Sequence, residues 1–217
     1  VTPDTTVTPD AVTPDAVTPD AVTPDVTVTA CIPSKVLTTI ATSDYVNNVA
    51  ISPDSKSVVG ALDGGVLKMW EASTGTLKQT FSGHTDAVWG VAFSPDGKVL
   101  GSASDDMNGK LWTVSSGAVL FTLSGHTDYI VGIAFSPDGK LVSTASSDTS
   151  VKLWDPATGS LKTTLTGHTD EVFSVSFDPT SKFLVSGAID KLAKIWNLNT
   201  NTTSQTLTGH TDEIYSV

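Results

Sequence analysis

Three sets of histidine, hydroxyl, aspartate and tryptophan residues recur along this chain with one internal spacing. In each set the hydroxyl residue follows the histidine by 18 positions, the aspartate by 22 and the tryptophan by 28. The sets are His84, Ser102, Asp106 and Trp112; His126, Thr144, Asp148 and Trp154; and His168, Ser186, Asp190 and Trp196. Serine, histidine and aspartate are also the residues of a hydrolase triad, in which the hydroxyl attacks a carbonyl carbon.

The repetition of these sets favours a structural role over catalysis. A hydrolase needs one triad, whereas this combination occurs three times at identical spacing. A buried tryptophan needs a partner for its indole N–H, and the hydroxyl can accept that bond. The hydroxyl can then donate to the histidine, and the histidine to the aspartate. We therefore interpret the sets as internal bracing that satisfies its own polar groups, and we predict no catalytic residues.

No other residues suggest a metal ion or a cofactor. Calcium takes six to eight oxygen ligands, and isolated Asp-Gly turns do not supply them. The four histidines are spread one per repeat, too far apart to share a zinc ion. The single cysteine, Cys31, has no histidine in its own segment, and there is no glycine-rich phosphate loop. We expect no metal site and no cofactor.

The sets belong to a tandem repeat of 42 residues. The run Gly-His-Thr-Asp begins at Gly83, Gly125, Gly167 and Gly209, and Trp70 extends the tryptophan series one repeat toward the N-terminus. A fixed period in this range, without insertions, indicates one supersecondary unit that has been copied in tandem.

Each repeat is predicted to form four antiparallel strands. In the repeat from residue 83 we expect strands over residues 87–94, 98–104, 110–114 and 118–123. The run Ser94-Pro95-Asp96-Gly97 between the first two has the residues of a tight turn. No room remains for a helix. One such sheet cannot cover both of its faces, but stacked copies can.

These residues resemble the WD-repeat (WD40) family. The Gly-His pair, the 28-residue step from histidine to tryptophan and the Trp154-Asp155 pair match its motif. At the Trp-Asp pair the other repeats depart only in the second residue, whereas the first repeat also lacks Gly-His. The resemblance implies an all-β fold, a β-propeller of four-stranded antiparallel blades around a central channel. It also implies that the three polar sets are the structural tetrads of the family.

We expect four complete blades, at residues 41–82, 83–124, 125–166 and 167–208, within a propeller domain at 26–217. Partial units flank them: strands at 26–30 and 36–40 within residues 26–40, and an innermost strand beginning at 213–217 within residues 209–217. The first blade has Thr42, Gly60 and Gly64 at the tetrad positions, so it should lack the network and be the weakest. Unpaired strand edges at the ends either continue into a longer polypeptide or pair between subunits.

Residues 1–25 form a separate low-complexity tract with five copies of Val-Thr-Pro-Asp. Recurrent proline excludes a helix, and the tract has no cation to balance its aspartates, so we expect an extended spacer. A disordered linker, a stalk that carries O-linked sugars and a recognition peptide all remain open. The candidate glycosylation sites are Thr2, Thr8, Thr13, Thr18 and Thr23, with Asn201 of the Asn-Thr-Thr run as an N-linked site if the protein is secreted.

Residues that vary between repeats mark a candidate partner-binding face. In the family, the positions that flank the aliphatic residue after Thr-Asp, and the position before the turn aspartate, line the face used for partners. Here these are Tyr45, Trp89, Asp105, Tyr129, Ser147, Glu171, Phe173 and Ile189. Aromatic residues among them could anchor a partner. The alternative is packing between blades or ordinary exposure at the rim.

The charge of the chain excludes two classes of partner. The net charge is −11, and all 12 basic residues are lysine, which argues against nucleic acid and anionic membranes. No apolar run is long enough for membrane insertion. The leading hypothesis is a non-enzymatic scaffold for protein or peptide partners. The alternative is a secreted or cell-surface glycoprotein that self-associates through open blade edges. We favour an extracellular location if the tract is glycosylated and a cytoplasmic one otherwise.

Overall fold

The structure is a computed structural model and describes residues 39–217. The Val-Thr-Pro-Asp tract, Cys31 and the expected strand at 26–30 lie outside the described residues, as do residues 36–38. Residues 39 and 40, at the end of the expected strand 36–40, are not in a strand.

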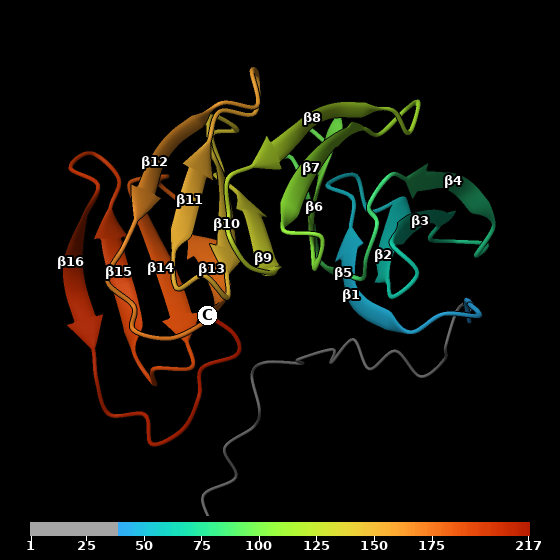
Figure 1. The fold of residues 1–217 in the computed structure, drawn as a ribbon. Helices are drawn as coiled ribbons and strands as arrows, with labels where there is room; N and C mark the ends of the chain where they lie inside the picture. The colour runs from blue at the N-terminus through green and yellow to red at the C-terminus, as the bar shows by residue number, and fades with distance from the viewer. Residues whose placement is uncertain (1–38) are drawn as a thin grey trace, which may run out of the picture. The chain divides into compact units, whose positions relative to one another are not determined.

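The described residues form sixteen strands and no helix, which confirms the prediction of an all-β fold (Figure 1). Each group of four consecutive strands makes one antiparallel sheet in chain order. The first blade holds β1 (Val46–Ile51), β2 (Ser57–Leu62), β3 (Val66–Glu71) and β4 (Leu77–Ser82); the second holds β5 (Val88–Phe93), β6 (Val99–Ser104), β7 (Asn108–Thr113) and β8 (Val119–Ser124). The third holds β9 (Ile130–Phe135), β10 (Val142–Ser146), β11 (Val151–Trp154) and β12 (Leu161–Leu165); the fourth holds β13 (Val172–Phe177), β14 (Phe183–Ala188), β15 (Ala193–Asn197) and β16 (Thr202–Leu207).

The Ser-Pro-Asp-Gly run makes the tight turn between β5 and β6. The backbone N–H of Gly97 donates to the carbonyl oxygen of Ser94 at 2.9 Å, and Gly97 has a φ of 70°, which glycine adopts without strain. Ser94 Oγ donates to Asp96 Oδ1 at 2.7 Å and accepts a bond from the backbone N–H of Val99 at 2.9 Å. These bonds close the turn and fix where β6 begins.

The four blades stack with their first strands next to one another, in the order β1, β5, β9 and β13. A cluster of buried apolar side chains fills each of the three contacts between consecutive blades. Glycine allows the closest approach, since a Cβ on Gly132 would lie 2.9 Å from the carbonyl oxygen of Phe173 in the next blade. Each blade therefore covers a face of its neighbour that the neighbour could not cover alone.

The last segment, 213–217, differs from the expectation, because it does not begin a strand. A strand needs hydrogen bonds to a partner strand, and no other described segment supplies one at this position. Ile214 is nevertheless buried, and its N–H donates to the carbonyl oxygen of Ala188 at 3.1 Å. Every described sheet therefore has all four strands, and the two ends of the stack present sheet faces.

Candidate functional site

The polar set of the second blade forms one continuous hydrogen-bonded network. The Trp112 indole N–H donates to Ser102 Oγ at 2.8 Å, and Ser102 Oγ lies 2.7 Å from His84 Nε2. His84 Nδ1 lies 2.7 Å from Asp106 Oδ2, which also accepts the backbone N–H of Thr85 at 3.1 Å. The network joins β6, β7, the turn between them and the loop before β5.

The third and fourth blades repeat this geometry. The three contacts, in the order tryptophan to hydroxyl, hydroxyl to histidine and histidine to aspartate, measure 2.9, 2.8 and 2.7 Å for Trp154, Thr144, His126 and Asp148. They measure 2.8, 2.7 and 2.8 Å for Trp196, Ser186, His168 and Asp190. Threonine replaces serine in the third blade without loss of a contact, because only the hydroxyl takes part.

Burial keeps the network histidines neutral. It lowers the pKa of His84, although the bond to Asp106 acts in the opposite direction. The pKa values of His126 and His168 are lowered for the same reason. A neutral imidazole that donates from Nδ1 to the aspartate keeps Nε2 as an acceptor for the hydroxyl proton. Each donor in the network therefore has an acceptor.

Hydrogen bonds keep the network aspartates ionised. Burial opposes the charge of Asp106, but bonds from His84 and from the backbone N–H groups of Thr85 and Asn108 outweigh it and lower the pKa of this carboxyl group. The pKa values of Asp148 and Asp190 are lowered in the same way, against the effect of burial. The carboxylate charge is thus stabilised inside the blade and is not offered to a ligand.

The network cannot act as a hydrolase triad in this arrangement. A nucleophile must reach the substrate carbonyl, but Ser102 is fully buried and its oxygen already accepts the indole N–H. The side chain of His84 is likewise closed off from solvent. Bracing of the blade is the role that this geometry supports.

The first blade has glycine where the others have the hydroxyl residue. A Cβ on Gly60 would lie 3.2 Å from Cζ3 of Trp70, so the indole packs against bare backbone. Thr42 takes the histidine position, and its hydroxyl donates to the carbonyl oxygen of Asp44 at 2.6 Å instead. This blade is held by packing without the polar network.

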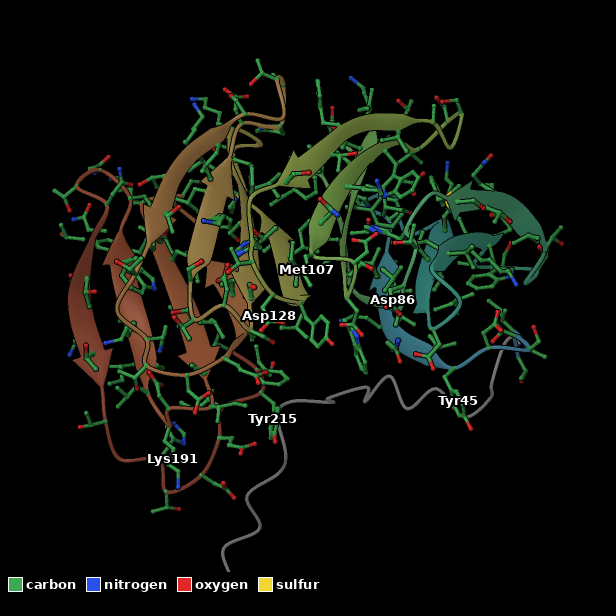
Figure 2. The ribbon with its side chains drawn as sticks, in the orientation of Figure 1. Tyr45, Asp86, Met107, Asp128, Lys191 and Tyr215 are labelled. Atoms are coloured by element: carbon green, nitrogen blue, oxygen red, sulfur yellow. The ribbon has the colours of Figure 1, made fainter. Side chains whose placement is uncertain are left out.

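A second group of residues lies at the end of the blades where each Thr-Asp loop meets the turn between the second and third strands. We call this end the loop face. Figure 2 labels Tyr45, Asp86, Met107, Asp128, Lys191 and Tyr215 along it. Three of the aromatic residues selected from the sequence, Tyr45, Trp89 and Tyr129, are exposed there.

The other selected residues are engaged within the protein. Ser147 Oγ donates to Glu171 Oε2 at 2.9 Å, which links the third and fourth blades. Phe173 meets Tyr215 edge-on, with ring centroids 5.2 Å apart. Ile189 is half-buried, and its N–H donates to the carbonyl oxygen of Glu171 at 2.9 Å. The structure therefore separates the exposed aromatic residues of the loop face from residues that are held by contacts within the protein.

The loop face is strongly acidic. Its loops and turns carry the carboxyl groups of Asp44, Asp63, Asp86, Asp105, Asp128, Asp170, Glu171, Asp212 and Glu213, beside the three aspartates of the networks. Lys191 is the one lysine in these same loops and turns of residues 41–213. Burial raises the pKa of Asp105 and outweighs a hydrogen bond from Trp89, and the nearby carboxylates of Asp86 and Asp63 raise it further.

Two exposed residues on this face, Met107 and Tyr215, were not selected from the sequence. Met107 has a φ of 63° and occupies the repeat position of Gly65, whose φ is 73°. A glycine at this repeat position indicates a turn residue with a left-handed backbone conformation. A larger side chain at the same position points outward. Tyr215 stands 42 positions after Phe173, so the repeat spacing also identifies it.

Among residues 39–217, no three histidine, cysteine, aspartate or glutamate side chains gather closely enough to hold a metal ion. The same residues include no helix that could cross a bilayer. A cavity of about 180 Å³ among the first strands is lined partly by Asn48, Gly90, Gly132 and Ser174.

Four-stranded antiparallel sheets that stack through their first strands define a protein of the β-propeller type. The chain belongs to the WD40 family: the family model for the WD domain, G-beta repeat, matches residues 34–71, 75–113, 117–155 and 159–197. Repeats of this family generally mediate protein–protein interactions as non-enzymatic scaffolds. No curated protein sequence matches the chain.

Proposed function

We propose that this protein is a non-enzymatic scaffold whose loop face binds a cationic segment of a protein or peptide partner. One observation carries the proposal: the exposed rings of Tyr45, Trp89 and Tyr129 lie on a face whose loops hold many carboxylates and a single lysine. Each blade that presents this face is a hydrogen-bonded four-stranded sheet, so we expect little ordering when a partner binds.

The two kinds of side chain have different roles in the proposed contact. The aromatic rings supply apolar anchors, and each can also hold a cation over its face, which is worth about 0.5–1 kcal/mol at an exposed site. The carboxylates attract a basic partner and orient it as it approaches. The two kinds of side chain are in contact at Trp89, because its indole is hydrogen-bonded to the Asp105 carboxyl group.

The test compares two labelled peptides by fluorescence anisotropy. In one, lysines and arginines surround an aliphatic residue; in the other, glutamates replace the basic residues. We expect the basic peptide alone to bind, with an affinity that falls as salt rises and falls about fivefold or more in Trp89→Ala. Asp86→Asn on the loop face should also weaken binding. The matched control, Asp96→Asn at the opposite end of the blades, should not. Equal binding of the two peptides, or unchanged binding by Trp89→Ala, contradicts the proposal.

A second candidate function, a surface glycoprotein, rests on the position of Asn201. This residue is exposed at the tip of the turn between β15 and β16, where a sugar could be attached without disturbing a blade. Mass spectrometry of the natural protein provides the test. Hexose on Asn201 or on the threonines of residues 1–25 supports this candidate, and unmodified peptides from both regions contradict it.

A further inference from the structure

Within residues 39–217, no segment packs over the apolar face of the first blade that β1 presents. On β1, the side chains of Val46, Val49 and Ile51 are 46, 61 and 65% exposed. Residues one repeat later on β5 are of similar type, yet Val88 is completely buried and Val91 is 7% exposed. The difference therefore arises from what lies against the strand and not from the strand itself.

The buried counterparts show what covers this kind of face. Val88 and Val91 pack in one cluster with Val59, Leu67 and Phe81, which belong to the preceding blade. Between the third and fourth blades, Val172 and Val175 pack in an equivalent cluster with Val151 and Leu165 of the blade before. Throughout the stack, the first strand of one blade is covered by the second, third and fourth strands of the blade before it.

The fourth blade carries a copy of that covering face that no further described blade packs against. Three repeats after Val59, Leu67 and Phe81 stand Val185, Ala193 and Leu207. Their apolar character is retained, but Leu207 is 38% exposed, whereas Phe81 is completely buried. The described stack thus ends in the exposed face of β1 at one end and, at the other, in a face of the fourth blade that is only partly covered.

The chain itself shows that the face on the fourth blade accepts such a strand. The segment 213–217 lies on it, and its Ile214 and Val217 occupy the repeat positions of Val46 and Val49. A Cβ on Gly187 would come within 2.6 Å of Ile214 Cγ2 and 2.9 Å of Val217 Cγ1, so both side chains pack directly on this residue. The N–H of Val217 donates to Ser174 Oγ at 3.1 Å.

We propose that copies of this chain associate head to tail. The open face of the first blade in one copy packs on the fourth blade of the next, with Val46 and Val49 in the places that Ile214 and Val217 hold in the single chain. The contact continues the interface already repeated between blades. It is heterologous, and it can close when the rotation between copies allows. Two copies hold eight blades, within the range of about four to eight for closed propellers.

The segment 213–217 then acts as an internal competitor. It is tethered to the fourth blade through residues 208–212, so its effective concentration at that face is on the order of millimolar. Ile214 is its one buried apolar side chain. Association must displace this residue, and a variant that keeps the segment from docking should associate more readily.

The experiment measures the mass of the full 217-residue chain by sedimentation equilibrium over a wide range of concentrations. Val49→Asp alters the open face of the first blade, and Leu207→Asp alters that of the fourth. We expect each variant alone to be monomeric and an equal mixture of the two to form a one-to-one complex, because one unaltered pair of faces remains. Ile214→Asp should associate at a concentration about tenfold lower than the native chain.

Val119→Asp is the matched control. Val119 is 43% exposed, but it lies on β8 in the second blade, which has a neighbour on both faces, so association should be unchanged. Several outcomes overturn the proposal. Leu207→Asp could still associate, which would indicate contact between two first blades. Val49→Asp could associate like the native chain, or the native chain and Ile214→Asp could both stay monomeric, as they would if another segment of the same chain covers β1.

Discussion

Trp112 Nε1 lies 2.8 Å from Ser102 Oγ, and this bond joins the third strand of the second blade to its second strand. Both residues are buried, so water is not an alternative partner for either group. An unpaired donor or acceptor in such a place costs about 1–3 kcal/mol. The fold should therefore respond to the loss of any member of a network.

His126→Ala should destabilise the protein by roughly 1–3 kcal/mol, because it leaves the Thr144 hydroxyl and the Asp148 carboxylate without their partner. Chemical denaturation followed by tryptophan fluorescence measures the change. His210→Ala is the matched control: this histidine is exposed, and its removal should alter the free energy of unfolding by about 0.5 kcal/mol or less. Equal effects of the two substitutions would argue against the bracing role.

Stability should fall when the pH drops below 6.5, the ordinary pKa of histidine. The pKa values of His84, His126 and His168 are lowered in the folded protein, so between 6.5 and those lower values the unfolded chain binds more protons. In this interval the free energy of unfolding falls by up to about 1.4 kcal/mol per unit decrease in pH for each histidine. The network aspartates, also with lowered pKa, add a further loss below their ordinary value of 3.8.

Denaturant unfolding at a series of pH values between about 8 and 5 checks this dependence. His126→Ala should show a shallower slope, since one of the three titrating groups is gone. A free energy of unfolding that stays constant through this interval, or that rises on acidification, would contradict burial of neutral imidazoles.

The network hydroxyls should not react with a fluorophosphonate probe, which labels activated serines. Ser102 and Ser186 are fully buried and hydrogen-bonded to both tryptophan and histidine. Peptide mass spectrometry after treatment reports the labelled residue, with a serine protease as the positive control. A phosphonylated Ser102 or Ser186 in the folded protein would revive the hydrolase interpretation.

Gly132→Ala should destabilise the contact between the third and fourth blades. The new Cβ would lie 2.9 Å from the carbonyl oxygen of Phe173 and 3.2 Å from Cβ of Ala145, so the blades must separate slightly, at about 1–3 kcal/mol. The same substitution at Gly64 places its Cβ 3.7 Å from the nearest atom, on Asp44, and should be tolerated. Thermal melts of the two variants provide the comparison; a smaller loss at Gly132 would contradict the close approach.

Much of this fold could be predicted because it repeats. The constant spacing of Trp70, Trp112, Trp154 and Trp196 leaves no room for an insertion, and the Ser-Pro-Asp-Gly turns of the second and third blades mark where the first strand ends and the second begins. The same spacing identifies the network residues, which the structure brings within hydrogen-bonding distance. For these features, local sequence and tertiary structure carry the same information.

The ends of the stack could not be predicted in this way. Val49 and Val91 are the same residue at the same repeat position, yet one is exposed and the other buried, because burial depends on the neighbouring blade. Segment 213–217 has the composition of a strand but no partner strand among the described residues. On the loop face, Met107 and Ser147 come from variable positions, so the sequence indicates their location but not which side chain is exposed.

The constant period has a genetic consequence. Excision of one 42-residue unit, such as 125–166, would join residues 124 and 167 in the same phase and leave every turn intact. The second blade would then meet Val175 and Phe177 of the fourth in place of Ile133 and Phe135, which now lie close to Gly101. Unequal recombination between repeats could thus change the number of blades in one step, and the number becomes a trait on which selection can act.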